Sequence, residues 1–190
     1  MRARTGHDPP NENSPLWEAV MADITGGCLC GRVRYTLSGE PTLSGLCHCR
    51  NCQRYTGSAF EPVMAFSSAN VSLQGELKTY EDKGDSGKAV LRRFCPNCGS
   101  GILAEAEAMP GIAIVLVGGF DDSSVFTPTM EIYCSSAQPW VHAGGERKQF
   151  PKDAGLRSPK AIGSSSLHKT LTGANDLIAS GSVIGCARER

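Results

Sequence analysis

Cysteines in three tight groups are the residues of this chain with the clearest capacity for chemistry. Seven of its nine cysteines stand in the segments Cys28-Leu29-Cys30, Cys47-His48-Cys49-Arg50-Asn51-Cys52 and Cys95-Pro96-Asn97-Cys98. Zinc–thiolate bonds are about 2.3 Å long and tetrahedral, so sulfurs that share one ion must converge to within about 4 Å. A C-x-x-C turn achieves this by wrapping the backbone around the metal, and a C-x-C pair on a strand places both sulfurs on one face. The spacing therefore predicts zinc binding.

Seven thiols suggest one group of four and one of three, and spacing alone leaves two divisions open. In the first, Cys49 and Cys52 join the Cys95–Cys98 pair, as in a zinc ribbon. In the second, the Cys28–Cys30 pair joins the Cys95–Cys98 pair and leaves the Cys47–Cys52 group on its own. We favour the second, because three ligands within six residues converge without outside help. A disulfide framework and a single structural zinc with spare thiols are the alternatives, and an odd cysteine count weighs against the former.

The number of ligands decides what each site can do. A closed four-thiolate site is structural, whereas a three-ligand site keeps one position free. Three thiolates on Zn²⁺ leave one net negative charge, so such a centre is a poor generator of hydroxide compared with a neutral three-histidine site. It favours an incoming thiol instead, which zinc binds as a thiolate. We expect a substrate thiol to take the free position, and to add to or leave from a carbonyl carbon.

Short strands are the elements expected to position these groups. Val33, Tyr35 and Leu37 alternate with polar residues, which is the period of a half-buried strand. Further strands are expected at residues 63–66, 71–73, 77–80, 89–94, 102–104, 112–117 and 130–133. One short helix is expected at residues 51–56, ended by Gly57. The pattern predicts a mainly β fold with its cysteines at turns.

Composition and charge narrow the class of protein. The chain has 190 residues, 40% of them hydrophobic, which is enough for a core. Its 19 basic and 19 acidic residues balance, which argues against a nucleic-acid or anionic-membrane partner. The longest apolar run, residues 111–120, is too short to cross a bilayer, and the start lacks the apolar stretch of a signal peptide. We therefore expect a cytoplasmic protein, in which close-set cysteines bind metal more often than they form disulfides.

The cysteine segments and their neighbours resemble the glutathione-dependent formaldehyde-activating enzyme family, which includes the centromere protein V type domain. The resemblance rests on the segments Gly26-Gly27-Cys28-Leu29-Cys30-Gly31-Arg32-Val33-Arg34-Tyr35, Cys47-His48-Cys49-Arg50-Asn51-Cys52-Gln53-Arg54, Gly57-Ser58-Ala59-Phe60, Phe94-Cys95-Pro96-Asn97-Cys98-Gly99 and Pro139-Trp140. It implies an Mss4-like fold of β-sheets pinned by zinc over residues 23–150. Residues 1–22 are expected to be a flexible lead-in and residues 151–190 a low-complexity, disordered tail.

The resemblance also implies a site and a reaction. Two zinc ions are expected, a structural one on Cys28, Cys30, Cys95 and Cys98, and a catalytic one on Cys47, Cys49 and Cys52. The family's name activity joins glutathione and formaldehyde into S-(hydroxymethyl)glutathione, a carbon–sulfur lyase reaction, so a small thiol and an aldehyde are the expected partners. A zinc-stabilised binding module without turnover is the main alternative, and a thiol or metal buffer is a third.

Several other residues near these groups carry weaker predictions. His48 is expected behind the ligands or facing solvent, and less so as a fourth ligand, because adjacent side chains diverge. Arginines that could bind substrate carboxylates, with solvated positions as the alternative, are Arg50, Arg54, Arg92 and Arg93. Trp140 is expected either to cover a pocket or to lie in the core. Cys134 is expected to be a small buried hydrophobe, and Cys186 a free thiol without function.

Overall fold

The structure, a computed structural model, describes residues 23–141 and 144–155. Its strands are β1 (Ile24–Gly27), β2 (Arg34–Leu37), β3 (Leu43–Cys47), β4 (Glu61–Ser67), β5 (Val71–Gln74), β6 (Lys78–Lys83), β7 (Ala89–Phe94), β8 (Gly101–Ala106), β9 (Ile112–Leu116), β10 (Met130–Ile132) and β11 (Lys148–Gln149). The α-helix of these residues is α2 (Arg50–Thr56). The predicted lead-in, Cys186 and most of the predicted tail lie outside the described residues.

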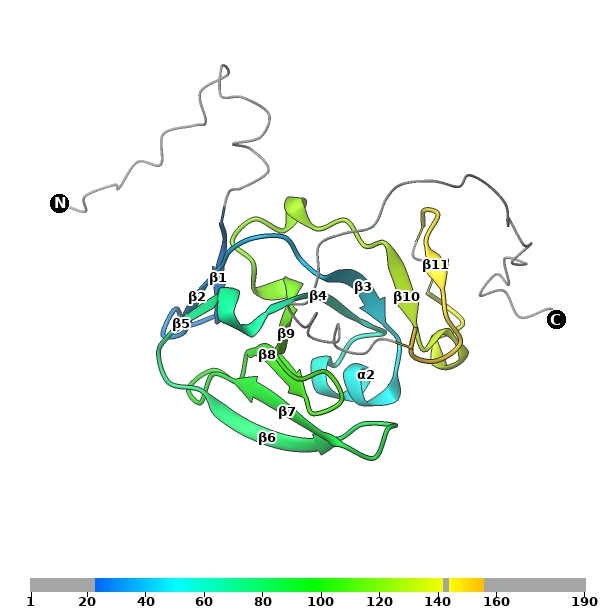
Figure 1. Cartoon of the computed structure of the whole chain (residues 1–190), viewed down its shortest axis with the longest axis horizontal. Coiled ribbons are helices and arrows are strands. Elements are labelled where there is room, and N and C mark those ends of the chain that lie inside the picture. The colour runs from blue at the N-terminus through cyan, green and yellow to red at the C-terminus, as the bar shows by residue number, and fades with distance from the viewer. Residues whose placement is uncertain (1–22, 142–143, 156–190) are drawn as a thin grey trace, which may run out of the picture.

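Two sheets share one core, which confirms the mainly β prediction (Figure 1). A three-stranded sheet has the order β1-β2-β5, and an eight-stranded sheet has the order β11-β10-β3-β4-β9-β8-β7-β6. The core draws Leu37 from the small sheet and Phe66, Ile102 and Val115 from the large one, each at most 1% exposed. None of the described helices is long and apolar enough to cross a membrane.

The expected strands agree with observed strands to within a few residues, and the helix begins one residue earlier than expected. In β2 the predicted alternation holds, because Tyr35 and Leu37 are buried and Arg34 is exposed. The sequence pattern missed β1, β3 and β11. Backbone hydrogen bonds continue past residue 150, since Tyr133 N donates to Lys152 O at 3.0 Å. The division of the chain at residues 22 and 150 stays a prediction.

β3 is the missed strand that matters for function, because Cys47 is its last residue. Its sequence, Leu-Ser-Gly-Leu-Cys, has no β-branched residue. Gly45 stands where β10 comes closest, and a Cβ added there would lie 2.9 Å from the Met130 carbonyl oxygen. Glycine inside a strand often marks such a close backbone approach. β3 is thereby held between β4 and β10, which fixes Cys47 at a central place in the large sheet.

Candidate metal centres and the adjoining groove

The first candidate centre gathers Cys28, Cys30, Cys95 and Cys98, whose sulfurs all lie within 4.8 Å of one another. Cys28 Sγ is 3.5 Å from Cys30 Sγ, and Cys30 Sγ is 3.8 Å from Cys95 Sγ. Sulfurs at the corners of a tetrahedron with 2.3 Å arms are about 3.8 Å apart, so the spacing fits a zinc ion. The eight described cysteines are all free thiols, which removes the disulfide alternative for these groups.

Two facing turns bring these four thiols together. Cys28 and Cys30 lie in the turn between β1 and β2, where Gly31 has a φ of 74° and its N–H donates to Cys28 O. Cys95 and Cys98 lie in the turn between β7 and β8, where Gly99 has a φ of 75°. The Cys28–Cys30 pair therefore lies in a turn and not on a strand. A glycine with left-handed backbone directly follows each pair of cysteines and allows the chain to turn there.

The second candidate centre gathers Cys47, Cys49 and Cys52, also with all sulfurs within 4.8 Å. Cys47 ends β3, Cys49 is the N-cap of α2, and the Cys52 N–H donates to Cys49 Sγ at 3.3 Å. Hydrogen bonds from the thiols of Cys47 and Cys52 lower the pKa of Cys49 to about 2. The hydrogen bond between Cys47 and Cys49 raises the pKa of Cys47 to about 12. Hydrogen bonding with the neighbouring thiols also raises the pKa of Cys52. A metal is bound by thiolates, so binding one here would release protons from the centre.

The donor sets fit the two predicted zinc ions in number and type. Four converging thiols can close a tetrahedron, whereas the second group offers three. Among the described residues, no histidine, cysteine, aspartate or glutamate joins that second group as a fourth donor within 4.8 Å. The structure thus brings together both favoured sets of cysteines, and the binding of zinc by each set stays a prediction.

A buried guanidinium stands against the three-thiol centre. Arg92 is 6% exposed, and its Nη2 lies 3.9 Å from Cys52 Sγ. Its Nε donates to Asp82 Oδ2 at 3.0 Å, its Nη1 lies 3.8 Å from Glu61 Oε2, and its guanidinium lies 4.8 Å from the centre of the Tyr55 ring. Burial raises the pKa of Glu61, which faces Cys47 across β3 and β4. Arg92 therefore balances negative charge at the centre, and its burial shows that the solvated position is wrong. Its role in binding a substrate carboxylate stays a prediction.

Of the other three predicted arginines, one forms an ion pair within the sheet and two line a groove. Arg93 Nε donates to Glu105 Oε2 at 2.6 Å, so that arginine is engaged within the sheet. Arg50 and Arg54 are exposed and line an open groove of about 640 Å³ beside α2. Arg50 directly follows Cys49, which places one end of this groove beside the three-thiol centre.

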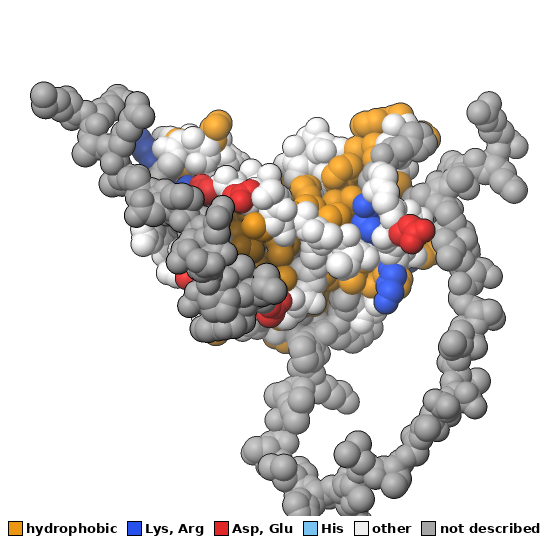
Figure 2. Space-filling view, turned by 90° about the horizontal axis from the view of Figure 1, so that it is seen from above, with side chains coloured by type: hydrophobic (Ala, Val, Ile, Leu, Met, Phe, Trp, Pro, Cys, Tyr) orange, Lys and Arg blue, Asp and Glu red, His pale blue; other side chains and the backbone are white. Residues whose placement is uncertain are grey.

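Aromatic and apolar side chains form the rest of this groove. Its remaining lining residues are Gln53, Gly57, Ser58, Ala59, Phe60, Gln138, Trp140 and Val141. Trp140 is 69% exposed, so it belongs to the groove and the expectation of a core position is wrong. In Figure 2, hydrophobic side chains reach the surface beside Lys and Arg side chains, on the side of the view where β10 and β11 lie.

His48 lies behind the two thiols that flank it. It is 1% exposed, and its Nε2 lies 2.9 Å from Glu131 Oε2. The solvent-facing alternative is therefore wrong, and its ring nitrogens are not part of the three-thiol group. Cys134 begins a short 3-10 turn after β10 and is partly exposed, whereas a buried position was expected. His48 was singled out in the sequence, whereas Glu131 and Arg147, which pairs with Glu131, were not.

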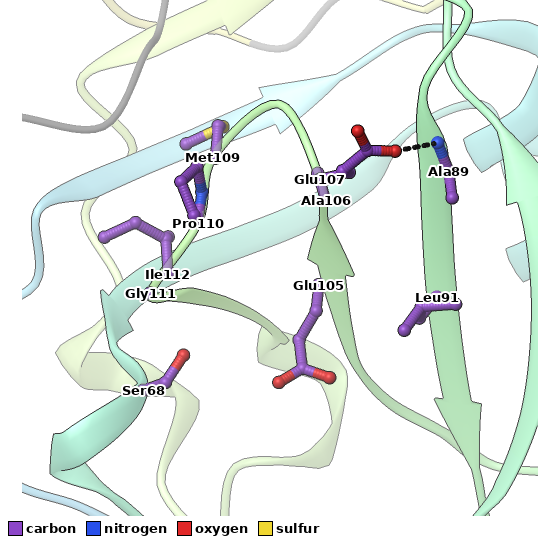
Figure 3. A pocket seen from close by; sticks show the side chains of 10 residues that line it. All are labelled: Ser68, Ala89, Leu91, Glu105, Ala106, Glu107, Met109, Pro110, Gly111 and Ile112. Atoms are coloured by element: carbon purple, nitrogen blue, oxygen red, sulfur yellow. Dashed lines mark hydrogen bonds between the residues drawn. The ribbon is translucent and has the colours of Figure 1, made fainter.

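A second hollow, of about 360 Å³, lies between β7, β8 and the turn that leads into β9 (Figure 3). Its acidic side chains are engaged, because Glu105 pairs with Arg93 and Glu107 accepts a hydrogen bond from Ala89 N at 3.4 Å. No cysteine lines it. No cysteine lines the groove beside α2 either, but that groove includes Arg50, the residue that follows Cys49 in the chain.

A mainly β protein with two cysteine clusters suited to zinc is the class that this fold and these sites define. The model of the glutathione-dependent formaldehyde-activating enzyme family matches residues 23–136, and the chain belongs to this family. Among solved structures, a Rhodobacter sphaeroides protein determined as a structural genomics target is similar at 19% identity. That match covers 51% of this chain and 87% of that chain, with a TM-score of 0.42. No curated protein matches the chain.

Proposed function

We propose that this protein is a zinc-dependent carbon–sulfur lyase of the glutathione-dependent formaldehyde-activating type, which makes or breaks a bond between a small thiol and an aldehyde. The observation that carries the proposal is the three-thiol centre beside an arginine-lined groove. Three donors leave room for a fourth ligand, and the family match supports glutathione and formaldehyde as the pair.

The groove supplies the contacts that a glutathione-like thiol needs. Arg50 and Arg54 both lie on its lining, and guanidinium groups bind carboxylates through paired hydrogen bonds. Trp140 and Phe60 offer apolar surface along the same groove. A peptide thiol lying there with a carboxylate on an arginine would extend its sulfur towards Cys49, the residue before Arg50.

Cys47, Cys49 and Cys52 would hold the catalytic zinc, which when bound would take up a thiol as thiolate and so lower the pKa of that thiol. In the proposed reaction the thiol sulfur forms a bond to the aldehyde carbon, the carbonyl π bond breaks, and the thiol proton ends on the former carbonyl oxygen. Arg92 opposes the accumulated negative charge of the thiolates from its buried position against Cys52. The chain's own residues thus hold the thiol, orient it and balance charge.

Glutathione and formaldehyde also combine without a catalyst, so the test compares initial rates with and without protein. Protein loaded with zinc is expected to speed formation of S-(hydroxymethyl)glutathione in proportion to its concentration, as followed by NMR of ¹³C-labelled formaldehyde. A rate equal to the spontaneous one, with both zinc ions in place, would leave the chain as a zinc-stabilised binding module.

Substitution of Arg54 with alanine tests the role of the groove. Arg54→Ala is expected to raise KM for glutathione about 10-fold and to leave kcat nearly unchanged, because a charged hydrogen bond to a distant part of the substrate is lost. Cysteamine, a thiol without carboxylates, should react equally with both proteins. Arg34→Ala is the matched control, since Arg34 pairs with Asp121 away from the groove. Equal KM values for glutathione would contradict carboxylate binding by Arg54.

A further inference from the structure

A buried chain of three polar residues stands behind the three-thiol centre. His48 Nε2 donates to Glu131 Oε2 at 2.9 Å. Glu131 Oε1 accepts from Arg147 Nε at 2.8 Å and forms an ion pair with Arg147 Nη2, also at 2.8 Å. Glu131 is 3% exposed, and the Arg147 side chain is 9% exposed. A carboxylate buried this deeply must be hydrogen-bonded or ion-paired. The Glu131 carboxylate is held by His48, which precedes it in the chain, and by Arg147, which follows it. We call this chain the His48–Glu131–Arg147 relay.

The relay is a set of hydrogen bonds and not a third metal centre. Cys134 Sγ lies within 4.8 Å of ligand atoms on His48 and Glu131, which is close enough to raise the question. Nitrogen and oxygen ligands at about 2.0 Å from a tetrahedral zinc would stand about 3.3 Å apart. The observed 2.9 Å between His48 Nε2 and Glu131 Oε2 is the distance of a hydrogen bond. The cation of Arg147 on the same carboxylate also opposes a second cation there.

The strand geometry links this relay to the thiols. Successive side chains of an extended chain point to opposite faces, so Cys47 and Cys49 share one face and His48 points to the other. The backbone of His48 is held on both sides, because its N–H donates to Ile132 O at 3.0 Å and its carbonyl accepts from Gln53 Nε2 at 2.6 Å. The side chain depends on Glu131 for its hydrogen bond, since the buried His48 Nδ1 has no partner among the described residues.

We propose that Glu131 and Arg147 are positioning residues for the three-thiol metal centre, an inference that rests on that part of the proposed function. Arg147 holds the Glu131 carboxylate in place, Glu131 fixes the His48 ring, and His48 sets the spacing of the two sulfurs on either side of it. Arg147 lies beyond residue 136, where the family match ends, so the segment that leads into β11 is part of this centre's support.

Cadmium binding to the full chain tests the relay without any substrate. ¹¹³Cd NMR gives separate resonances for four-sulfur and three-sulfur sites, so each variant carries its own internal control. Glu131→Gln and Arg147→Gln are each expected to weaken cadmium binding at the three-thiol centre about 10- to 100-fold, the usual effect of removing a group that orients a ligand. Binding at the four-thiol centre should stay unchanged. Arg147→Lys should recover part of the loss, because it keeps the charge.

Glu105→Gln is the matched control, since it also breaks a glutamate–arginine pair, at a residue that belongs to neither group of thiols. Equal affinities in the wild type and both relay variants would overturn the inference. So would loss of both resonances together with the far-UV circular dichroism of the sheets, which would make the relay a support of the whole domain. A third resonance that vanishes in Glu131→Gln would make it a metal site. Because no thiol or aldehyde is added, failure of the enzymatic proposal would leave this result standing.

Discussion

Replacement of Cys95 with serine is expected to unfold the domain. Cys95 is 1% exposed, and the four-thiol centre ties the turn between β1 and β2 in the small sheet to the turn between β7 and β8 in the large one. A structural zinc site contributes about 10 kcal/mol or more to folding, and a domain of this size has a net stability of about 5–15 kcal/mol. Losing one of the four zinc ligands therefore removes most of the net free energy of folding.

Two measurements test this expectation. Far-UV circular dichroism on heating follows unfolding, and metal analysis of the purified variant counts its zinc ions. Cys95→Ser should lose at least one zinc and show no cooperative unfolding transition under conditions where the wild type does. Cys134→Ser is the matched control, because this thiol belongs to neither centre and should keep both metals. A Cys95→Ser protein with the wild-type unfolding midpoint would show that the four thiols do not hold a structural metal.

Replacement of Cys49 with serine is expected to abolish activity while the fold survives. Cys49 is the N-cap of α2 and directly precedes Arg50, which lines the groove. Serine is a good N-cap residue that can accept the same hydrogen bond from Cys52 N. The variant should lose about one zinc per chain and at least about 100-fold in the rate of adduct formation, since two thiols cannot hold the metal as three do.

The thermal midpoint of Cys49→Ser should stay close to that of the wild type, which separates it from Cys95→Ser. Full activity after the loss of one zinc would contradict a catalytic role for the three-thiol centre. Loss of both metals would contradict the separation of the chain into two independent centres.

Local patterns predicted the parts of the fold that depend on neighbouring residues. The alternation in β2 and the apolar run of β9 reveal strands because their side chains bury one face or both. β3 could not be predicted from local sequence, because its Gly45 is required by the close approach of Met130 in another strand. No local pattern encodes that approach. The strand that carries Cys47 could therefore be found only once β10 was placed beside it.

Part of the candidate site could likewise be predicted from local sequence, and part of it could not. The three cysteine groups are visible in the sequence because each converges over a few residues, yet their pairing depends on which turns face each other in the folded sheets. Spacing alone left two divisions open. The contact between His48 and Glu131 joins residues 83 positions apart, and a lone glutamate in β10 has no local signal. Buried polar partners of this kind are found only from the packed structure.

In the enzyme that we propose, four thiols close one centre while the other centre keeps a position for a substrate thiol. X-ray absorption at the zinc edge counts the sulfur atoms around each metal, averaged over both. The wild-type protein with two zinc ions should give about 3.5 sulfurs per zinc without added thiol, rising to about 4 when glutathione is added. A count of about 4 before glutathione is added, or one that glutathione leaves unchanged, would contradict the open centre and the function proposed from it.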